Sequence, residues 1–380
     1  MPISRRDLFR QLGIGAAATA ALPSLAEIGL GAALPFPASS GSAGPVILSR
    51  NENAYGPSEK VIAAMRGTVH AANRYPLAQD DELRDRVAAL HSIKAERIVF
   101  GCGSSEILTT AVASFAGPGK KIITASPTFE LPGHAAQIEG SEVITVPLDK
   151  SFGHDLGAML SKADASTGLI YICNPNNPTA SITPRAGIED FLRKLPRTAM
   201  VLIDEAYHHF VPSTASYASF IDKPVDDDRL IVARTFSKVY GLAGIRVGYA
   251  VASPEVAEKL SARCIPAGVN LAAAVAAVSA LEDQEFVRAC VKNNGENRQE
   301  FSNQAKARKL ATIDSNANFV MMNAQRPAPQ VIEHFKKNGV LIGRPFPPLD
   351  NYIRVTLGKS AEMAEFWRVW DLAPAHKLGT

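Results

Sequence analysis

Short apolar runs alternate with helical stretches along the middle of the chain, and no other feature constrains the fold as strongly. Each run is short enough to be a single buried strand. Strands that alternate with helices are typical of an α/β fold whose sheet is mostly parallel. The runs are Arg97 to Phe100, Lys121 to Ala125, Glu142 to Leu148, Gly168 to Cys173, Met200 to Asp204, Leu230 to Ala233 and Val247 to Ala252.

The amino-acid composition changes at Pro254, where long stretches rich in Ala, Lys, Glu and Gln begin, and this change indicates a second domain. A chain of 380 residues is long enough for two domains. We expect residues 46–253 to form an N-terminal arm and a large domain, and residues 254–380 to form an interdomain helix and a small α+β domain. The amphipathic stretch from Val269 to Ala307 is predicted to be the joining helix. Three short elements are expected after it: Asn318 to Met322, Pro329 to Lys337 and Val340 to Ile342.

Residues 1–45 differ from the rest of the chain. Arg5-Arg6 precedes an apolar, Ala/Gly-rich run from Leu12 to Leu22, and this layout resembles a twin-arginine export signal. The run is too short to span a bilayer, so no membrane anchor is expected after processing. The stretch from Leu34 to Pro45 is predicted to be a flexible linker. We therefore expect a periplasmic or secreted protein; the alternative is a cytoplasmic protein with an amphipathic N-terminal helix.

Charge and cysteine content argue against two classes of function. Lys and Arg total 40 against 37 for Asp and Glu, a formal net charge of +3 without a basic block, so no nucleic-acid partner is expected. The four cysteines form no C-x-x-C pair, which predicts neither a zinc site nor a disulfide framework. Adjacent side chains diverge, so His208-His209 is not expected to bind a metal.

The most informative motif is R-T-F-S-K-V-Y-G-L-A-G-I-R-V-G-Y, residues 234–249. It places hydroxyl groups beside Lys238 and an arginine eight positions later. A lysine at a strand end is by itself usually a solvated surface residue. The whole segment, however, resembles the lysine motif of fold-type I aminotransferases that depend on pyridoxal 5'-phosphate (PLP), closest to the histidinol-phosphate aminotransferase branch. The resemblance implies that Lys238 forms a Schiff base with PLP and that Thr235, Ser237 and Arg246 hold its phosphate.

Two further motifs match the same family. Asp204 ends an apolar run and opens D-E-A-Y. PLP needs a carboxylate against its pyridine nitrogen so that the ring can accept electrons, and the resemblance gives this role to Asp204 and a hydrogen bond to the phenolic oxygen to Tyr207. The segment N-P-N-N-P-T, residues 174–179, implies that Asn177 binds the same oxygen. The structural alternatives are that Asp204 only caps a strand-to-helix turn and that residues 174–179 form an ordinary turn.

A glycine loop and an aromatic residue are expected to contact the cofactor. G-C-G-S-S-E, residues 101–106, lies between a strand and an apolar helical run, where free backbone N-H groups favour a phosphate. The loop matches the family's phosphate cup and implies that Gly103, Ser104 and Ser105 bind there, although Ser104 could be only an N-cap. Phe129 occupies the place of the family's ring-stacking aromatic; a core phenylalanine is the alternative.

Motifs near the two ends of the body imply a dimer and substrate contacts. Tyr55, in N-E-N-A-Y-G-P, resembles a family tyrosine that reaches the partner's cofactor phosphate, so a homodimer is expected. Arg354, in R-V-T-L-G, matches an arginine that holds the substrate α-carboxylate through two parallel hydrogen bonds. Arg344 lies near a family arginine that contacts a distal phosphate, but Gly343 and the prolines from 345 to 348 alter the spacing.

The motifs keep the family's order over residues 47–372. They imply a fold-type I structure with a mostly parallel, seven-stranded sheet in the large domain. They also imply a PLP-dependent aminotransferase that moves an amino group between an amino acid and a 2-oxo acid, with Lys238, Asp204 and Tyr207 as catalytic residues. A decarboxylase, lyase or cyclase on the same scaffold is the alternative. The motifs do not specify the amino acid.

Overall fold

The computed structural model describes residues 44–212 and 216–373. The predicted export signal lies outside the described residues, as does nearly all of the linker. Within the described part, no helix is both long enough and apolar enough to cross a membrane. The same residues contain no group of three or more His, Cys, Asp or Glu side chains arranged to hold a metal ion.

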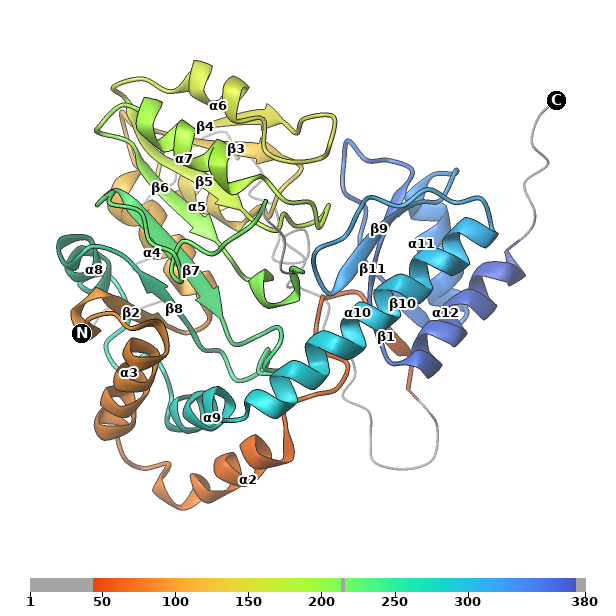
Figure 1. Ribbon diagram of the computed structural model, residues 1–380, viewed down its shortest axis with the longest axis horizontal. Coiled ribbons are helices and arrows are strands. Elements are labelled where there is room, and N and C mark those ends of the chain that lie inside the picture. Colours follow the sequence, from red (N-terminus) through yellow and green to blue (C-terminus); the bar gives the residue numbers. More distant parts are fainter. Residues whose placement is uncertain (1–43, 213–215, 374–380) are drawn as a thin grey trace, which may run out of the picture. The chain divides into compact units, whose positions relative to one another are not determined.

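The main feature of the fold is a seven-stranded sheet with the strand order β2-β8-β7-β6-β5-β3-β4 (Figure 1). Only β8 runs antiparallel to its neighbours. The predicted mostly parallel, seven-stranded sheet is thus confirmed. The strands are β2 (Ile98–Gly101), β3 (Lys121–Ser126), β4 (Glu142–Pro147), β5 (Thr167–Cys173), β6 (Met200–Asp204), β7 (Leu230–Thr235) and β8 (Gly248–Val251).

Helices cover both faces of this sheet, because alternate strand residues point to opposite sides. On one face, Ile170 and Ile203 pack in a core cluster with residues of α3, α7 and α9. On the other face, Tyr171 and Leu202 pack with residues of α4, α5 and α8. The helices of this part are α2 (Glu59–Gly67), α3 (Leu77–His91), α4 (Ser104–Phe115), α5 (Leu131–Ile138), α6 (Leu156–Lys162), α7 (Arg185–Lys194), α8 (Pro254–Ser261) and α9 (Leu271–Glu282), with 3-10 turns η1 (Val69–Ala71), η2 (Ala95–Arg97) and η3 (His208–Phe210).

The C-terminal part has a separate core around Phe301, Phe335 and Phe366. Two small sheets belong to it, β1 with β10 in parallel and β9 with β11 antiparallel. The first described strand therefore pairs with a strand almost 300 residues later, and Figure 1 shows it among the blue C-terminal elements. The elements are β1 (Val46–Leu48), α10 (Gln284–Ala307), β9 (Phe319–Asn323), α11 (Ala328–Lys337), β10 (Val340–Ile342), β11 (Tyr352–Thr356) and α12 (Ser360–Leu372).

The predicted single joining helix is two helices, α9 and α10, separated at Asp283. The Asp283 side chain accepts a hydrogen bond from the Phe286 N-H and so caps the start of α10. That start contributes Val287 to the core of the large sheet, whereas Phe301 near the other end belongs to the C-terminal core. Of these two helices, only α10 therefore contributes side chains to both cores.

Candidate active site

The candidate site lies where the parallel strands end. Because β2 and β7 are both antiparallel to β8, they run in the same direction as β3, β5 and β6. Ligands of α/β proteins bind outside the carboxyl ends of such strands. The residues that follow these ends are the predicted ones: Gly103, Ser104 and Ser105 after β2, Phe129 after β3, Asn177 after β5, Asp204 and Tyr207 at and after β6, and Ser237 and Lys238 after β7.

Lys238 lies among these strand ends with its amine in a protein interior. Its Nζ donates to the Arg50 carbonyl at 3.3 Å and lies 5.5 Å from the centre of the Tyr207 ring. Burial, and to a smaller extent the charge of Arg354, lowers the pKa of the Lys238 amine to about 8. About a tenth of the amine is therefore uncharged at pH 7, and the uncharged form is the one that attacks a carbonyl.

Asp204 is buried at the end of β6. Its Oδ2 accepts a hydrogen bond from the Tyr171 hydroxyl at 3.0 Å, and its Oδ1 accepts one from the Ala206 N-H at 3.1 Å. Burial raises the pKa of Asp204 to about 6, against the effect of these two hydrogen bonds and of the Lys238 charge. A buried carboxylate of this kind is suited to a cationic partner such as a protonated ring nitrogen.

The glycine loop lies against Arg246. Gly103 has a φ of +77°, and a Cβ added to it would lie 2.1 Å from Arg246 Nη2, so only glycine permits this approach without strain. Arg246 Nη1 donates to Ser237 Oγ at 3.3 Å, and Thr235 Oγ1 donates to the same oxygen at 3.0 Å. A guanidinium, two hydroxyls and the start of α4 at Ser104 form a donor set that fits a phosphate group.

Tyr207 and Asn177 have partners from other segments of the chain. The Tyr207 hydroxyl accepts from Asn51 Nδ2 at 3.0 Å, a contact that sequence reasoning missed although Asn51 belongs to the segment that precedes Tyr55. Burial raises the pKa of Tyr207, so its hydroxyl stays protonated. Asn177 Oδ1 accepts from Arg354 Nη1 at 2.6 Å. Asn177, which is predicted to bind the cofactor, is thus in direct contact with Arg354, which is predicted to bind the substrate carboxylate.

Arg354 is buried and reaches the site from β11. Its Nη2 donates to the Ser49 carbonyl at 2.8 Å, and its Nε has no hydrogen-bond partner in the described part of the chain. The guanidinium lies 4.7 Å from the centre of the Phe346 ring. Burial lowers the pKa of Arg354 to about 10, which leaves the side chain charged at neutral pH and ready to bind an anion.

Arg344 is close to this arginine but is already paired. Its Nη2 donates to the Glu130 carboxylate, and its guanidinium lies 4.4 Å from the Phe346 ring centre. The side chains of this ion pair are 35% and 41% exposed. Arg344 therefore lies near the site in a solvent-exposed ion pair with Glu130.

Two predicted contacts are not visible within the single chain. Phe129 packs, partly buried, against the hydrophobic cluster on the α4 face of the sheet, so its stacking on the cofactor stays a prediction. The Tyr55 hydroxyl accepts from Asn297 Nδ2 of α10 at 3.1 Å in the same chain. Its predicted reach into a partner subunit also stays a prediction.

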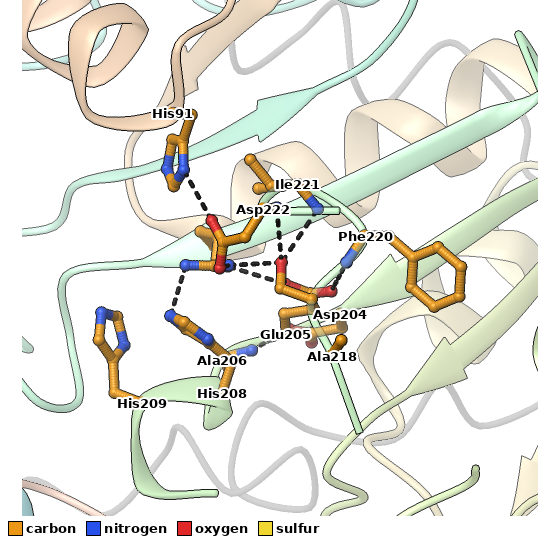
Figure 2. A network of polar contacts seen from close by, with 12 residues as sticks. His91, Asp204, Glu205, Ala206, His208, His209, Ala218, Phe220, Ile221 and Asp222 are labelled. Carbon is orange, nitrogen blue, oxygen red and sulfur yellow. Dashed lines mark hydrogen bonds and ion pairs between the residues drawn. The ribbon is translucent and has the colours of Figure 1, made fainter. Parts of the chain in front are cut away.

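A buried ion-pair network lies behind the site, and the motifs did not indicate it. Arg234 Nε donates to Glu205 at 2.9 Å, and its other nitrogens donate to Ser219, Asp222 and His208 (Figure 2). Burial and the Arg234 charge lower the pKa of His208, which therefore accepts as a neutral ring. The network links the end of β6 to the end of β7. Glu205 directly follows Asp204, and Arg234 directly precedes Thr235.

Residues 44–369 match the family model described as "Aminotransferase class I and II". The chain belongs to this family. It is 38% identical over 326 residues to the histidinol-phosphate aminotransferase of Methylobacillus flagellatus, which covers 85% of this chain and 87% of that protein. The predicted PLP-dependent aminotransferase activity is confirmed.

Solved structures agree. A putative histidinol-phosphate aminotransferase from Erwinia carotovora superposes with a TM-score of 0.81 at 32% identity, over 86% of this aminotransferase and 94% of that chain. The Sinorhizobium meliloti histidinol-phosphate aminotransferase was solved in complex with pyridoxal-5'-phosphate. It gives a TM-score of 0.80 at 25% identity, and the match covers 91% of this chain and 98% of that chain. The fold-type I assignment and PLP as the cofactor are confirmed, and the aminotransferase acts on small amino-acid and 2-oxo-acid substrates.

Proposed function

We propose that the predicted residues hold PLP and substrate in the roles that the family resemblance implies. When bound, PLP supplies a carbonyl that captures the substrate amine and a ring that accepts electrons from the substrate carbon. Gly103, Ser104, Ser105, Thr235, Ser237 and Arg246 bind the phosphate, and Phe129 lies against the ring. Asn177 and Tyr207 bind the phenolic oxygen, Asp204 holds the proton on the ring nitrogen, and Lys238 bonds covalently to the cofactor.

Lys238 also moves a proton in this proposal. Its amine has a pKa of about 8 in the cofactor-free site, close to working pH, where a general acid and base is most effective. The amine can therefore take a proton from the substrate carbon and return it elsewhere. The burial of this amine beside Asp204 and Arg354 is the observation that carries the proposal.

We further propose that the amino donor carries an anionic group next to its reacting carbon, and that Arg354 binds it. Arg354 carries a positive charge, but its hydrogen-bond partners among the described residues, Asn177 and the Ser49 carbonyl, are neutral, and its Nε has no partner there. Free amino acids present a carboxylate at that position. The relatives are named for histidinol phosphate, and that compound presents a phosphate ester instead. Both anions suit a guanidinium.

A substrate panel tests the reaction and its donor. We expect at least one anionic donor to lose its amino group to 2-oxoglutarate or pyruvate, which becomes glutamate or alanine. The donor product is a 2-oxo acid from an amino acid and a keto phosphate from histidinol phosphate. Arg354→Gln should raise KM for that donor by roughly 30-fold or more, because a buried charge pair is lost. Arg344→Gln is the matched control and should change KM less, since Arg344 is already paired with Glu130. Carbon dioxide release without a new amino acid would contradict transamination.

We propose that the aminotransferase is a homodimer. Three large apolar side chains in one short segment are exposed, Val69 at 68%, Tyr75 at 82% and Leu77 at 66%, and neighbouring exposed apolar groups favour burial in an interface. A second copy of the chain is the proposed partner. Sedimentation velocity of the wild type should give the mass of two chains, and a monomer at micromolar concentration would contradict the proposal.

We also propose export through the twin-arginine route after folding and loading of the cofactor. Arg5-Arg6 and the short apolar run that follows support it. Changing both arginines to lysine should retain an active, uncleaved, PLP-loaded enzyme in the cytoplasm. Arg10→Lys, in the same segment, should leave export unchanged. Fractionation that finds the wild type wholly cytoplasmic, with residues 1–22 intact, would overturn this proposal.

A further inference from the structure

Asp204 ends β6 and Glu205 follows it, and these two carboxylates have separate partners. Glu205 accepts hydrogen bonds from the Ser219 hydroxyl, the Phe220 N-H and Arg234, at 2.7, 2.8 and 2.9 Å. Asp204 has none of these partners. In the described part of the chain, the only side chain that donates a hydrogen bond to it is Tyr171, whose hydroxyl lies 3.0 Å from Oδ2. The site carboxylate thus has one backbone donor, the Ala206 N-H, and one side-chain donor, the Tyr171 hydroxyl.

Strand register explains how Tyr171 reaches this carboxylate. Tyr171 pairs with Leu202, and Cys173 pairs with Asp204. Residues two apart on neighbouring strands share one face of the sheet, so the tyrosine extends along that face to Asp204 Oδ2. Its ring is fully buried in the cluster that contacts α4. Burial and the negative charge of Asp204 raise the pKa of Tyr171, so its hydroxyl remains a donor.

We propose that Tyr171 is a positioning residue for transamination, whose hydroxyl fixes the Asp204 carboxylate and keeps it ionised. This inference rests on the proposed role of Asp204. The ionisable groups around the carboxylate are Tyr171 and Cys173 of β5, Glu205 and Tyr207 after β6, and Lys238 after β7. Among these, Tyr171 and Lys238 favour the charged form of Asp204, and Glu205 opposes it.

The hydroxyl is more than a space-filling group in this arrangement. Phenylalanine would fill the same volume in the core, but it would leave Asp204 Oδ2 without a donor in a buried site. Lys238, the other favourable group, is engaged with the cofactor in the working enzyme under the proposed function. The hydrogen bond from Tyr171 then becomes the remaining side-chain contribution of the chain to an ionised Asp204.

Tyr171→Phe tests the inference without disturbing the core. In cofactor-free protein, carbon-13 NMR of labelled aspartate should show the pKa of Asp204 raised by about one unit or more. At pH 7, its ionised fraction would fall from roughly nine-tenths to roughly half. In the loaded enzyme, kcat should fall roughly tenfold with KM for the amino donor nearly unchanged. The acid limb of the pH profile of kcat should move to higher pH.

Tyr249→Phe is the matched control. Tyr249 is another buried tyrosine, on β8, but its hydroxyl bonds to His91 at 2.8 Å rather than to Asp204. The control should leave the pKa of Asp204 and the pH profile unchanged. A loss of thermal stability common to both variants, without a change in the pH profile of Tyr171→Phe, would make Tyr171 only structural and overturn the inference.

A double variant separates this inference from the proposed function. Tyr171→Phe should add no further loss of kcat to Asp204→Asn, because the tyrosine acts through that carboxylate. If Asp204→Asn alone has nearly normal turnover, the proposed role of Asp204 fails. If Asp204→Asn is impaired but Tyr171→Phe behaves as wild type in NMR and kinetics, only the positioning role fails.

Discussion

Replacing Lys238 with alanine should abolish both covalent attachment of PLP and transamination. The variant loses the amine that bonds to the cofactor and the group that moves the substrate proton, and we expect turnover to fall by at least about 10⁴-fold, the upper range for a proton-transferring group. Borohydride treatment followed by peptide mass spectrometry should find the cofactor on Lys238 in the wild type. The variant should retain the cofactor only noncovalently.

The pH dependence of attachment provides a second measurement. The Lys238 amine has a pKa lowered from 10.5 to about 8 in the cofactor-free protein, and only the uncharged amine reacts with a carbonyl. The rate of PLP attachment should therefore rise as the pH increases through about 8 and then level off. Lys223→Ala, at an exposed lysine, should change neither result. A reducible linkage that persists in Lys238→Ala would place the covalent bond on another residue.

Asp204→Asn should retain the fold but lower kcat by roughly two to four orders of magnitude. An amide cannot carry the negative charge that holds a proton on the ring nitrogen. The amide is nearly the same size as the carboxylate and can still accept from Tyr171, so the sheet should remain intact. Kinetics with saturating PLP, with circular dichroism as the folding check, measures the effect. Turnover close to that of the wild type would contradict the assigned role.

Glu205→Gln is the informative comparison. Glu205 is adjacent to Asp204 in sequence but belongs to the Arg234 network behind the site (Figure 2). Removing one charge from a buried ion pair costs roughly 3–5 kcal/mol of folding free energy. The loss in this variant should therefore appear in thermal stability, whereas the loss in Asp204→Asn should appear in turnover per folded molecule.

Much of the site could be predicted because its residues follow strand ends in recognisable segments. The runs that became β5, β6 and β7 also marked where Asn177, Asp204 and Lys238 would meet. Parallel strands place their carboxyl ends along one edge of the sheet, so local patterns were enough to predict a site assembled from distant parts of the chain.

The remaining features depend on tertiary contacts that no local pattern reports. Tyr171 has the alternating, buried position of any strand aromatic, and only the register with β6 shows that its hydroxyl meets Asp204. The break at Asp283 was missed because helical sequence continues on both sides of it. The bond from Asn297 to Tyr55 joins residues 242 positions apart.

The pairing of β1 with β10 has a consequence for biogenesis. Val46 to Leu48 find their strand partners only at Val340 to Ile342, and the neighbouring Ser49 carbonyl is held by Arg354. A ribosome must therefore synthesise nearly the whole chain before the arm beside the site acquires its native contacts. During translation, the large sheet can form while this arm is still unpaired. The site thus becomes complete only at the end of synthesis, and cofactor capture can report that the chain has finished folding.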